Sequence, residues 1–414
     1  MLKIDGHAYS PALLQKILTM AGSADSFEAA ATALRDVGEI EISARTVNQL
    51  SAQLGGELAD ERNRRTQTYE QQPLPRVPTV ADPPPSLAAV FCDGGRMRTR
   101  AAGCGHGIHH PHWRETKNAA FHRMRSTSHD HDPQPDLPDC LRNQAYVERL
   151  VLGLKKAKNP QPELIPTPAA EPQPRAEIAE VAAMWQPQTV VRTCVSSLAG
   201  SDEFGPMMAA EADTRGFFAA DKRAFVGDGQ KYNWSIQERW FPTFRPIVDF
   251  IHVVEYVYDA AKALCPDPVQ RWTQYVAWAR ACWQANTCQV LQELSEHLSA
   301  MAADEPGCSG EGPRQTIQRT LTYLTNNGSR MDYPCYRREG LPVTSSLAES
   351  LVKQISKRVK GTEKFWDDGP RGEAILQIRA ALISQDNRLA RFIRNRPICP
   401  YSPRCRPLPL NSPR

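Results

Sequence analysis

Apolar residues recur at helical spacing through the first 68 residues. Three such segments begin directly after Ser10, Ser26 and Ser43, and serine is a favoured N-cap residue. In the third segment Val47 and Leu50 lie on one face of the predicted helix. The pattern predicts a small all-α domain over residues 1–68, either a helix-turn-helix-like module or a plain three-helix bundle.

A helix-turn-helix module would use the polar face of its last helix to bind DNA. The candidate DNA-binding residues on that face of the third segment are Arg45, Asn48 and Gln49. In a plain three-helix bundle the same side chains would only be solvated. The N-terminal pattern leaves both interpretations open.

After a proline-rich linker at residues 69–86 the pattern changes to short apolar runs. Residues 87–95 form a continuous apolar run that ends in Asp-Gly-Gly, which predicts a buried strand followed by a turn. Residues 96–100 alternate and are predicted to pair with this strand as a hairpin. Further strands are predicted at 117–124, 189–198, 223–229 and 245–250.

Helical spacing returns between and after these strands. Residues 204–217 and 252–264 predict helices, and the segment from 266 to about 330 is helical and rich in Trp and Gln. This order describes an α/β sandwich that carries a helical insertion. The predicted divisions after the linker are a core at 87–265 with a proline-rich insertion at 126–175, a helical insertion at 266–340, the last part of the core at 341–390, and a disordered basic, proline-rich tail at 391–414.

Composition narrows the class of protein. The chain has 414 residues, of which 41% are hydrophobic and 23% charged, so it is long enough for several globular domains. The net charge is only +4, so a polyanionic partner would need the basic residues gathered on one face. No apolar run approaches the roughly 18 residues that span a bilayer, and the opening segment is too polar for a secretory signal. These features predict a cytoplasmic protein with no membrane partner.

Two predicted strands end with the same chemistry. Asp93 is followed by Gly94, and Asp228 is followed by Gly229. An aspartate at the end of a strand points its carboxylate into the crevice beyond the sheet edge, and the glycine lets a ligand approach the backbone. Asp-Gly is also the commonest turn signal, so each pair taken alone favours a simple turn.

A third carboxylate, Glu349, lies near the start of a predicted helix rich in lysine. Ser346 and Glu349 have the spacing of a capping box, which would explain the glutamate without any chemistry. The apolar stripe of this helix is predicted to consist of Leu347, Leu351, Ile355 and Val359, with Ala348 and Val352. Glu349 flanks this stripe, and from there it could reach a cleft at the sheet edge. Lys353, Lys357 and Lys360 would then line the approach to the cleft and bind the DNA backbone.

Three carboxylates in one cleft repel one another unless a divalent cation lies between them. Oxygen ligands of this kind suit Mg²⁺ or Mn²⁺. Two such ions about 3.5 to 4 Å apart would hold the attacking and leaving oxygens of a phosphodiester displacement. Asp93, Asp228 and Glu349 are therefore candidate metal ligands.

Several segments, in this order, resemble one family of proteins. They are FCDGGRMRTR, PHWRETKNAAFHRM, RGFFAADKRAFVGDGQKYNW, FRPIVDFIHVVEYVYDAA and RMDYPCYRREGLPVTSSLAESLVKQISKRVKGTEKFW. Together they resemble the DDE transposases of bacterial insertion sequences, in the Kra-type group related to Mutator-like elements. The resemblance covers roughly residues 20 to 390.

The resemblance implies an RNase H-like catalytic core with a helical insertion before its last acidic helix. It implies that Asp93, Asp228 and Glu349 are the catalytic, metal-binding acids, with Mg²⁺ or Mn²⁺ as cofactor. Asp249 and His252 match the (C/D)xxH signature that follows the second acid in Mutator-like enzymes, and they would support the site. Asp249 is thus the rival of Asp228, which is preferred because its Asp-Gly strand end mirrors that of Asp93.

The implied activity is metal-dependent cleavage of DNA strands and transfer of the freed 3′-hydroxyl into target DNA. The implied partners are double-stranded DNA, as terminal inverted repeats and as target, and further copies of the chain in a homo-oligomer on that DNA. Such a protein would associate with the nucleoid when bound to DNA. The alternative is a catalytically inactive or truncated transposase-derived protein that only binds DNA. A glycosidase-like use of paired carboxylates is disfavoured by the lysine-rich helix around Glu349.

Overall fold

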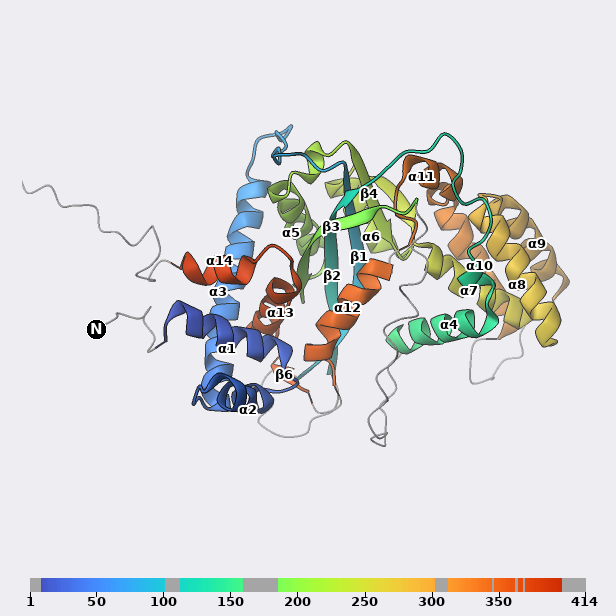
Figure 1. Ribbon diagram of the computed structural model, residues 1–414. Helices are drawn as coiled ribbons and strands as arrows, with labels where there is room; N and C mark the ends of the chain where they lie inside the picture. The colour runs from blue at the N-terminus through green and yellow to red at the C-terminus, as the bar shows by residue number, and fades with distance from the viewer. Residues whose placement is uncertain are drawn as a thin grey trace, which may run out of the picture.

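A mixed β-sheet lies at the centre of the protein, with helices around it (Figure 1). The computed structural model describes residues 9–100, 112–158, 185–301, 312–344, 346–361, 364–367 and 369–396, and it describes no side chains for 156–158 and 346–350. The strands are β1 (Leu87–Arg100), β2 (His112–Arg125), β3 (Gln188–Ser197), β4 (Lys222–Gly227), β5 (Arg245–Val248) and β6 (Trp366–Asp367). The predicted α/β class is confirmed.

The sheet has the order β3-β2-β1-β4-β5, and β6 pairs with the far part of β1. β2 is antiparallel to both β1 and β3, whereas β4 is parallel to both β1 and β5. β1 therefore has a partner on each side along its first half. Every residue from Leu87 to Cys92 is buried, which explains why this segment is a continuous apolar run instead of an alternating one.

The predicted hairpin within residues 87–100 is wrong. β1 continues without a break through Asp93 and the two glycines that follow it, and its antiparallel partner is β2. The segment stays extended because β2 pairs with it along its whole length. Glycine is needed at position 95 because a Cβ atom there would lie 2.6 Å from Thr116 Oγ1 and 2.9 Å from Asn118 Nδ2.

The helices account for most of the remaining described chain. They are α1 (Pro11–Ser23), α2 (Phe27–Gly38), α3 (Ala44–Glu70), α4 (Gln144–Lys158), α5 (Ser201–Thr214), α6 (Lys231–Trp240), α7 (Phe250–Leu264), α8 (Pro268–Trp283), α9 (Thr287–Ala300), α10 (Pro313–Asn327), α11 (Tyr333–Glu339), α12 (Ser346–Val359), α13 (Pro370–Ile383) and α14 (Arg388–Arg394), with short 3₁₀ turns at Asp139–Arg142, Phe217–Ala219 and Gly328–Arg330. Within the described ranges, none of these helices is long and apolar enough to cross a membrane.

The predicted starts of the first three helices are confirmed. The side chains of Ser10, Ser26 and Ser43 accept hydrogen bonds from the third residue after each of them, at 3.3, 2.9 and 3.1 Å. The third helix is longer than its apolar pattern alone indicates, because α3 continues through two glycines and a charged segment to Glu70.

The first three helices share a hydrophobic core with the last two. Leu14 on α1 and Leu54 on α3 belong to the same buried cluster as Ile378 on α13 and Leu389 on α14. Figure 1 shows α1, α2 and α3 beside α13 and α14, on one side of the sheet. The ends of the described chain thus meet in one packed unit, and the division at residue 68 stays a prediction.

The C-terminal segment also covers the outer edge of β3. The Gln385 amide donates to Arg192 O (2.8 Å), and its side-chain oxygen accepts from the Arg192 amide (2.9 Å). On α13, Gln377 Nε2 donates to Ser196 O (2.7 Å). An uncovered edge strand would present these backbone groups to other chains, so the contacts protect the sheet.

Helices α4 and α8 to α11 form a lobe on the other side of the sheet (Figure 1). α8 to α11 confirm the helical pattern predicted from residue 266 onward. The loop that follows β2 is fixed against this lobe. Arg337 on α11 is fully buried, donates from Nε to Asp132 Oδ1 (2.7 Å), and lies over the Trp283 ring. Trp283 Nε1 in turn donates to Gln134 O (2.9 Å).

We expect adjacent glycines on α3 to respond in opposite ways to substitution. A Cβ on Gly55 would lie 2.4 Å from Ala374 O on α13, so Gly55→Ala should lower the free energy of unfolding by about 1–3 kcal/mol. A Cβ on Gly56 meets no described atom within 4 Å, so Gly56→Ala should raise it by about 0.5–1 kcal/mol. Urea denaturation measures both, and equal effects would contradict the close packing of α3 on α13.

We expect His122 to make the fold sensitive to acid. Burial, and secondarily Arg192, lowers the pKa of His122 from 6.5 to about 3. Between these two pKa values the His122 imidazole is protonated in the unfolded chain but not in the folded chain. The free energy of unfolding is therefore highest above pH 6.5 and decreases as the pH falls toward 3. Between pH 6.5 and 4.5 the loss should be roughly 2 kcal/mol. The His122→Gln variant should lack this pH-dependent loss. Urea denaturation of both proteins at pH 6.5 and pH 4.5 measures the difference.

Candidate functional site

Asp93 and Asp228 are neighbours on the two central parallel strands. β1 pairs with β4 up to Cys92 and Gly227, so the two aspartates directly follow the last pair. Both carboxylates raise the pKa of the buried Cys92 thiol, after the larger effect of burial itself. The register and this shared electrostatic effect put the two acids at one place in the sheet.

Different helices cover the two faces of β1 beside Asp93. Asp93 is partly exposed, and its Oδ1 accepts a hydrogen bond from the Gly94 amide (2.7 Å). A Cβ on Gly94 would point toward Tyr232 on α6, and a Cβ on Gly95 would point toward Val352 on α12. Because successive residues of a strand face opposite sides, α6 and α12 cover opposite faces of β1 beside Asp93.

The Asp228 carboxylate is held through one oxygen. Its Oδ1 accepts from the Gln230 amide (3.0 Å) and from Asn233 Nδ2 (2.8 Å), and the residue is 9% exposed. Asn233 lies in the first turn of α6 and is completely buried. The described contacts therefore orient the carboxylate while they leave Oδ2 for a ligand.

The helical insertion fixes the turn that carries Asp228. Tyr323 on α10 donates its hydroxyl to Asp228 O (3.1 Å), and its ring lies against Gly229, whose φ of 91° favours glycine. One helical turn later, Asn327 Oδ1 accepts from Trp234 Nε1 (2.9 Å) on α6. The insertion thus contacts both the turn and the helix that hold the Asp228 side chain.

Asp249 has a different environment from Asp228. It follows β5, is completely buried, and caps α7 by accepting from the Ile251 amide (3.0 Å). His252 lies one turn later with Nε2 3.8 Å from Asp249 Oδ2 and Nδ1 3.3 Å from Glu255 Oε2. The (C/D)xxH segment therefore places buried polar side chains at the start of α7. This helix follows β5, which is the neighbour of β4 in the sheet.

Glu349 lies in the first turn of α12, and its side chain is outside the described atoms. The position of the helix is clear from the residues that follow. Val352 Cγ1 would be 3.5 Å from a Cβ on Gly95, and Leu351 and Ile355 are buried as the predicted apolar stripe requires. The Glu349 backbone is thus one turn from a residue that packs on β1 two positions beyond Asp93.

A buried arginine anchors the far end of α12. Arg358 Nε donates to Ala21 O on α1 (2.7 Å), and its guanidinium lies over the rings of Phe27 and Trp366. Burial lowers the pKa of Arg358 to about 10. The helix that carries Glu349 is therefore attached to the N-terminal helices at one end and to β1 along its length.

The three predicted lysines lie along or just after α12. Lys353 and Lys357 are exposed, whereas Lys360 is partly buried. Burial, and after it the charge of Arg96 on β1, lowers the pKa of Lys360. Arg96 is exposed three residues after Asp93 on β1, whereas Lys360 follows the end of α12 that is farther from Glu349.

The predicted DNA-binding residues of α3 lie elsewhere. Arg45 and Gln49 are exposed and Asn48 is partly buried, all in the first two turns of the helix. The opposite face, with Val47 and Leu50, packs into the core shared with α13 and α14. The structure leaves the polar face of α3 accessible and does not bring it together with the carboxylates.

The donor atoms suit a hard divalent cation. Asp93 and Asp228 offer carboxylate oxygens from adjacent strands, which is the ligand type that Mg²⁺ and Mn²⁺ prefer. Among the side chains that the structure describes, no group of three or more His, Cys, Asp and Glu residues could hold a metal ion. The third predicted ligand, Glu349, is not among those side chains.

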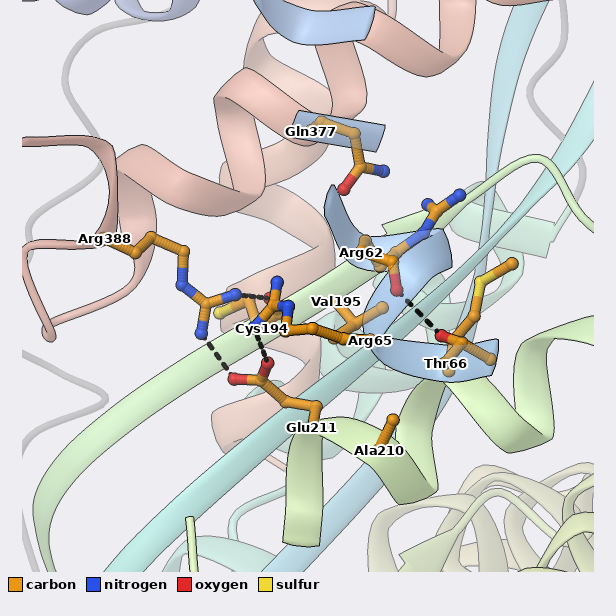
Figure 2. A pocket seen from close by; sticks show the side chains of 10 residues that line it. Arg62, Arg65, Thr66, Cys194, Val195, Ala210, Glu211, Gln377 and Arg388 are labelled. Atoms are coloured by element: carbon orange, nitrogen blue, oxygen red, sulfur yellow. Dashed lines mark hydrogen bonds and ion pairs between the residues drawn. The ribbon is translucent and has the colours of Figure 1, made fainter. Parts of the chain in front are cut away.

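A separate polar pocket lies where α3, β3, α5, α13 and α14 meet (Figure 2). Its buried Glu211 pairs with Arg388 (2.5 Å), Arg215 (3.0 Å) and Arg65 (3.7 Å). Burial raises the pKa of Glu211, but these three guanidinium groups together outweigh it and hold the pKa at about 2. Asp386 also pairs with Arg215 and Arg388, so we interpret the cluster as a network of ion pairs that connects the N- and C-terminal helices to α5.

Sequence reasoning missed the residues that position Asp228. Asn233 had a local signal, because it follows Asp228 by five residues and falls in the first turn of the next helix. Tyr323 had none, since it lies 95 residues from Asp228 in the chain. Only tertiary packing brings its hydroxyl to the Asp-Gly turn.

No known protein-family model matches the chain, and no curated protein matches it either. The proposals below therefore rest on the residues and geometry of this chain and on the resemblance of its motifs.

We expect Tyr323→Phe to loosen the Asp228 turn. The substitution leaves the Asp228 carbonyl without its buried donor, so the free energy of unfolding should fall by about 1–2 kcal/mol. Hydrogen exchange at the Gln230 amide should also become faster. Tyr336→Phe is the matched control, because its hydroxyl makes a longer bond to Pro246 O (3.4 Å) away from Asp228. Unchanged exchange at Gln230 in Tyr323→Phe would contradict the positioning role.

Proposed function

We propose that the protein is a DDE transposase that cleaves DNA strands and transfers them in a metal-dependent reaction. The observation that carries the proposal is the pairing of Cys92 with Gly227, which makes Asp93 and Asp228 neighbours. The packing of α12, which carries Glu349, against β1 next to this pair supports the same conclusion. These are the three acids that the resemblance names.

The topology supports the RNase H-like core that we propose. Three antiparallel strands are followed in the chain by two parallel strands added on the other side of β1, in the order β3-β2-β1-β4-β5. In the chain, α5 connects β3 to β4, and α6 connects β4 to β5. The helices α8 to α11 then fall between the last of these strands and α12, as the proposed insertion requires.

Asp228 is our choice for the second catalytic acid. Its carboxylate has an oxygen that the described hydrogen bonds leave open, and it directly follows the strand next to β1. Asp249 is completely buried and caps α7. We assign Asp249 and His252 a supporting role, in which they keep the start of α7 and the end of β5 in place beside Asp228.

Asp93, Asp228 and Glu349 would hold Mg²⁺ or Mn²⁺, which supplies charge neutralisation and an activated attacking oxygen when bound. The protein's own part is positioning. Asn233 and the Gln230 amide orient one carboxylate, and β2 and β4 hold the strand that carries the other. No covalent intermediate with the protein is needed.

The proposed DNA contacts lie on two surfaces. Lys353, Lys357 and Lys360 would bind phosphates on the approach to the acids. The exposed polar face of α3, with Arg45, Asn48 and Gln49, would bind the element's terminal repeats at a distance from them. Double-stranded DNA as repeat and target, a homo-oligomer on that DNA, and a nucleoid-associated location in the cytoplasm complete the proposal.

We expect purified protein with Mg²⁺ or Mn²⁺ to nick or join DNA that carries the sequences flanking its coding region. Asp93→Asn, Asp228→Asn and Glu349→Gln should each reduce the rate to about one per cent or less, because each removes a metal ligand. Asp36→Asn is the matched control, since Asp36 is an exposed residue of α2 paired with Arg35. Each variant should keep its DNA affinity and its unfolding midpoint.

The second candidate function is a DNA-binding protein without catalysis, which the exposed polar face of α3 favours. Wild-type protein that binds the flanking DNA but never nicks it with either metal would select this alternative. Arg45→Ala should then reduce binding, while the three acidic substitutions leave it unchanged.

The choice between Asp228 and Asp249 has its own test. Asp249→Ser keeps a side chain that can cap α7. Its nicking rate should therefore remain at least about tenfold higher than that of Asp228→Asn. Rates are compared at equal folded fraction, determined by circular dichroism. A greater loss in Asp249→Ser would make Asp249 the second acid.

A further inference from the structure

Four polar residues lie in one row across the central sheet, at the level of the acids. Ser196 on β3 is the strand partner of Asn118 on β2, and Asn118 is the partner of Asp93 on β1. On the other side of β1, Asp228 directly follows the residue that pairs with Cys92. Residues that pair directly in an antiparallel sheet share one face, so the side chains of Ser196, Asn118 and Asp93 lie on the same side of the sheet.

This face is the one that α12 covers. A Cβ on Gly95 would lie 2.9 Å from Asn118 Nδ2 and 3.5 Å from Val352 Cγ1 on α12. Gly95 follows Asp93 by two positions, and every second residue of a strand faces the same side. The Asn118 amide therefore lies on the side of β1 to which Asp93 points, beneath the helix that carries Glu349.

The Asn118 amide is held at both ends. Asn118 is 1% exposed, and its Oδ1 accepts a hydrogen bond from Ser196 Oγ (2.7 Å). Its Nδ2 donates to Thr116 Oγ1 (3.2 Å) and to Thr116 O (3.3 Å). Ser196 is completely buried, and its carbonyl accepts from Gln377 Nε2 on α13 (2.7 Å). These contacts fix the plane of the amide beside Asp93.

The polar pair of Ser196 and Asn118 differs from the row before it on the same face. That row consists of buried apolar residues, which are Cys194, Ala120, Phe91 and Val226. A buried hydrogen-bonded pair adds little net stability, because an apolar pair of similar shape can replace it at almost no cost. Packing of the sheet therefore does not require these two residues to be polar, and their place beside Asp93 indicates a role at the acids.

We propose that Asn118 is a positioning residue that orients the Asp93 carboxylate toward a divalent cation. The inference rests on the proposed function, in which Asp93 and Asp228 hold Mg²⁺ or Mn²⁺. Cβ atoms of directly opposite residues lie about 4.5–5.5 Å apart, so the amide can hydrogen-bond to the carboxylate through one water. Since Asn118 is neutral, it gives this support without the repulsion that another carboxylate would add.

Asn118→Leu removes the amide and keeps the branched shape of the side chain. Loss of a hydrogen-bonding partner behind a metal ligand weakens metal binding by about 10- to 100-fold, so the Kd for Mn²⁺ should rise at least about tenfold. The Kd is measured on the full chain without DNA, from the electron paramagnetic resonance signal of free Mn²⁺. Urea denaturation gives the folded fraction at which the proteins are compared. A purely structural role predicts the wild-type Kd, and that result would overturn the positioning role.

Ser196→Ala tests the same role from a residue that is farther from the acids. The substitution removes the hydroxyl that fixes Asn118 Oδ1, so the Kd for Mn²⁺ should rise, but by less than in Asn118→Leu. Ser197→Ala is the matched control, because Ser197 is the next residue on the opposite face and its buried hydroxyl donates to Glu373 Oε1 (3.0 Å). It should leave the Kd unchanged, and equal effects of the two serine substitutions would contradict the inference.

The double variant Ser196→Ala/Asn118→Leu tests whether the serine acts through Asn118. Its Kd for Mn²⁺ should equal that of Asn118→Leu alone, because the hydroxyl then has no amide to orient. Effects that multiply in the double variant would show that Ser196 acts by another route and would overturn the proposed row.

The outcomes distinguish the inference from the function on which it rests. If Asp93→Asn weakens Mn²⁺ binding but Asn118→Leu does not, the positioning role alone is overturned. If the Kd for Mn²⁺ is the same in the wild type and in Asp93→Asn, the proposed metal site is overturned, and the inference with it. Weaker binding in both variants at equal folded fraction supports both.

Discussion

The candidate site depends on the parallel register of β1 and β4. Because Cys92 pairs with Gly227, one acid follows each strand at the same level of the sheet. A shift of the register by one residue would separate the acids and would also exchange the faces on which Phe225 and Val226 pack. The buried residues on both sides, among them Phe91 and Phe225, make such a shift unfavourable.

The same register brings charges into a largely apolar environment, and much of the surrounding structure orients them. Asn233 and the Gln230 amide hold Asp228, Tyr323 holds its carbonyl, and α12 packs beside Asp93. These contacts come from α6, from the helical insertion and from the last part of the core. The insertion is therefore more than a lobe attached to the sheet, since it fixes the backbone turn that carries one of the acids.

The two ends of the described chain stabilise the other side of the molecule. α1 to α3 share a core with α13 and α14, Glu211 links three arginines across the same region, and the segment after α13 covers the edge of β3. Arg358 connects this unit to α12 through the Ala21 carbonyl. A change in the N-terminal helices, such as binding of DNA to α3, would thus act on the unit to which the helix of Glu349 is anchored.

Elements that depend on local interactions could be predicted from the sequence. Serine caps begin the first three helices, and the apolar run at 87–92 is a central strand. Leu351, Ile355 and Val359 form the buried stripe of α12. All of these features are local, because capping and periodic burial act over a few residues. The Asp-Gly pair at Asp228 is a true turn, but the one at Asp93 lies within a continuous strand, since β2 supplies a partner that a local pattern cannot reveal. That Tyr323 holds Asp228 and that the first and last described helices share a core follows from the tertiary structure alone. These contacts join residues that are far apart in the chain, and packing rather than local sequence selects them.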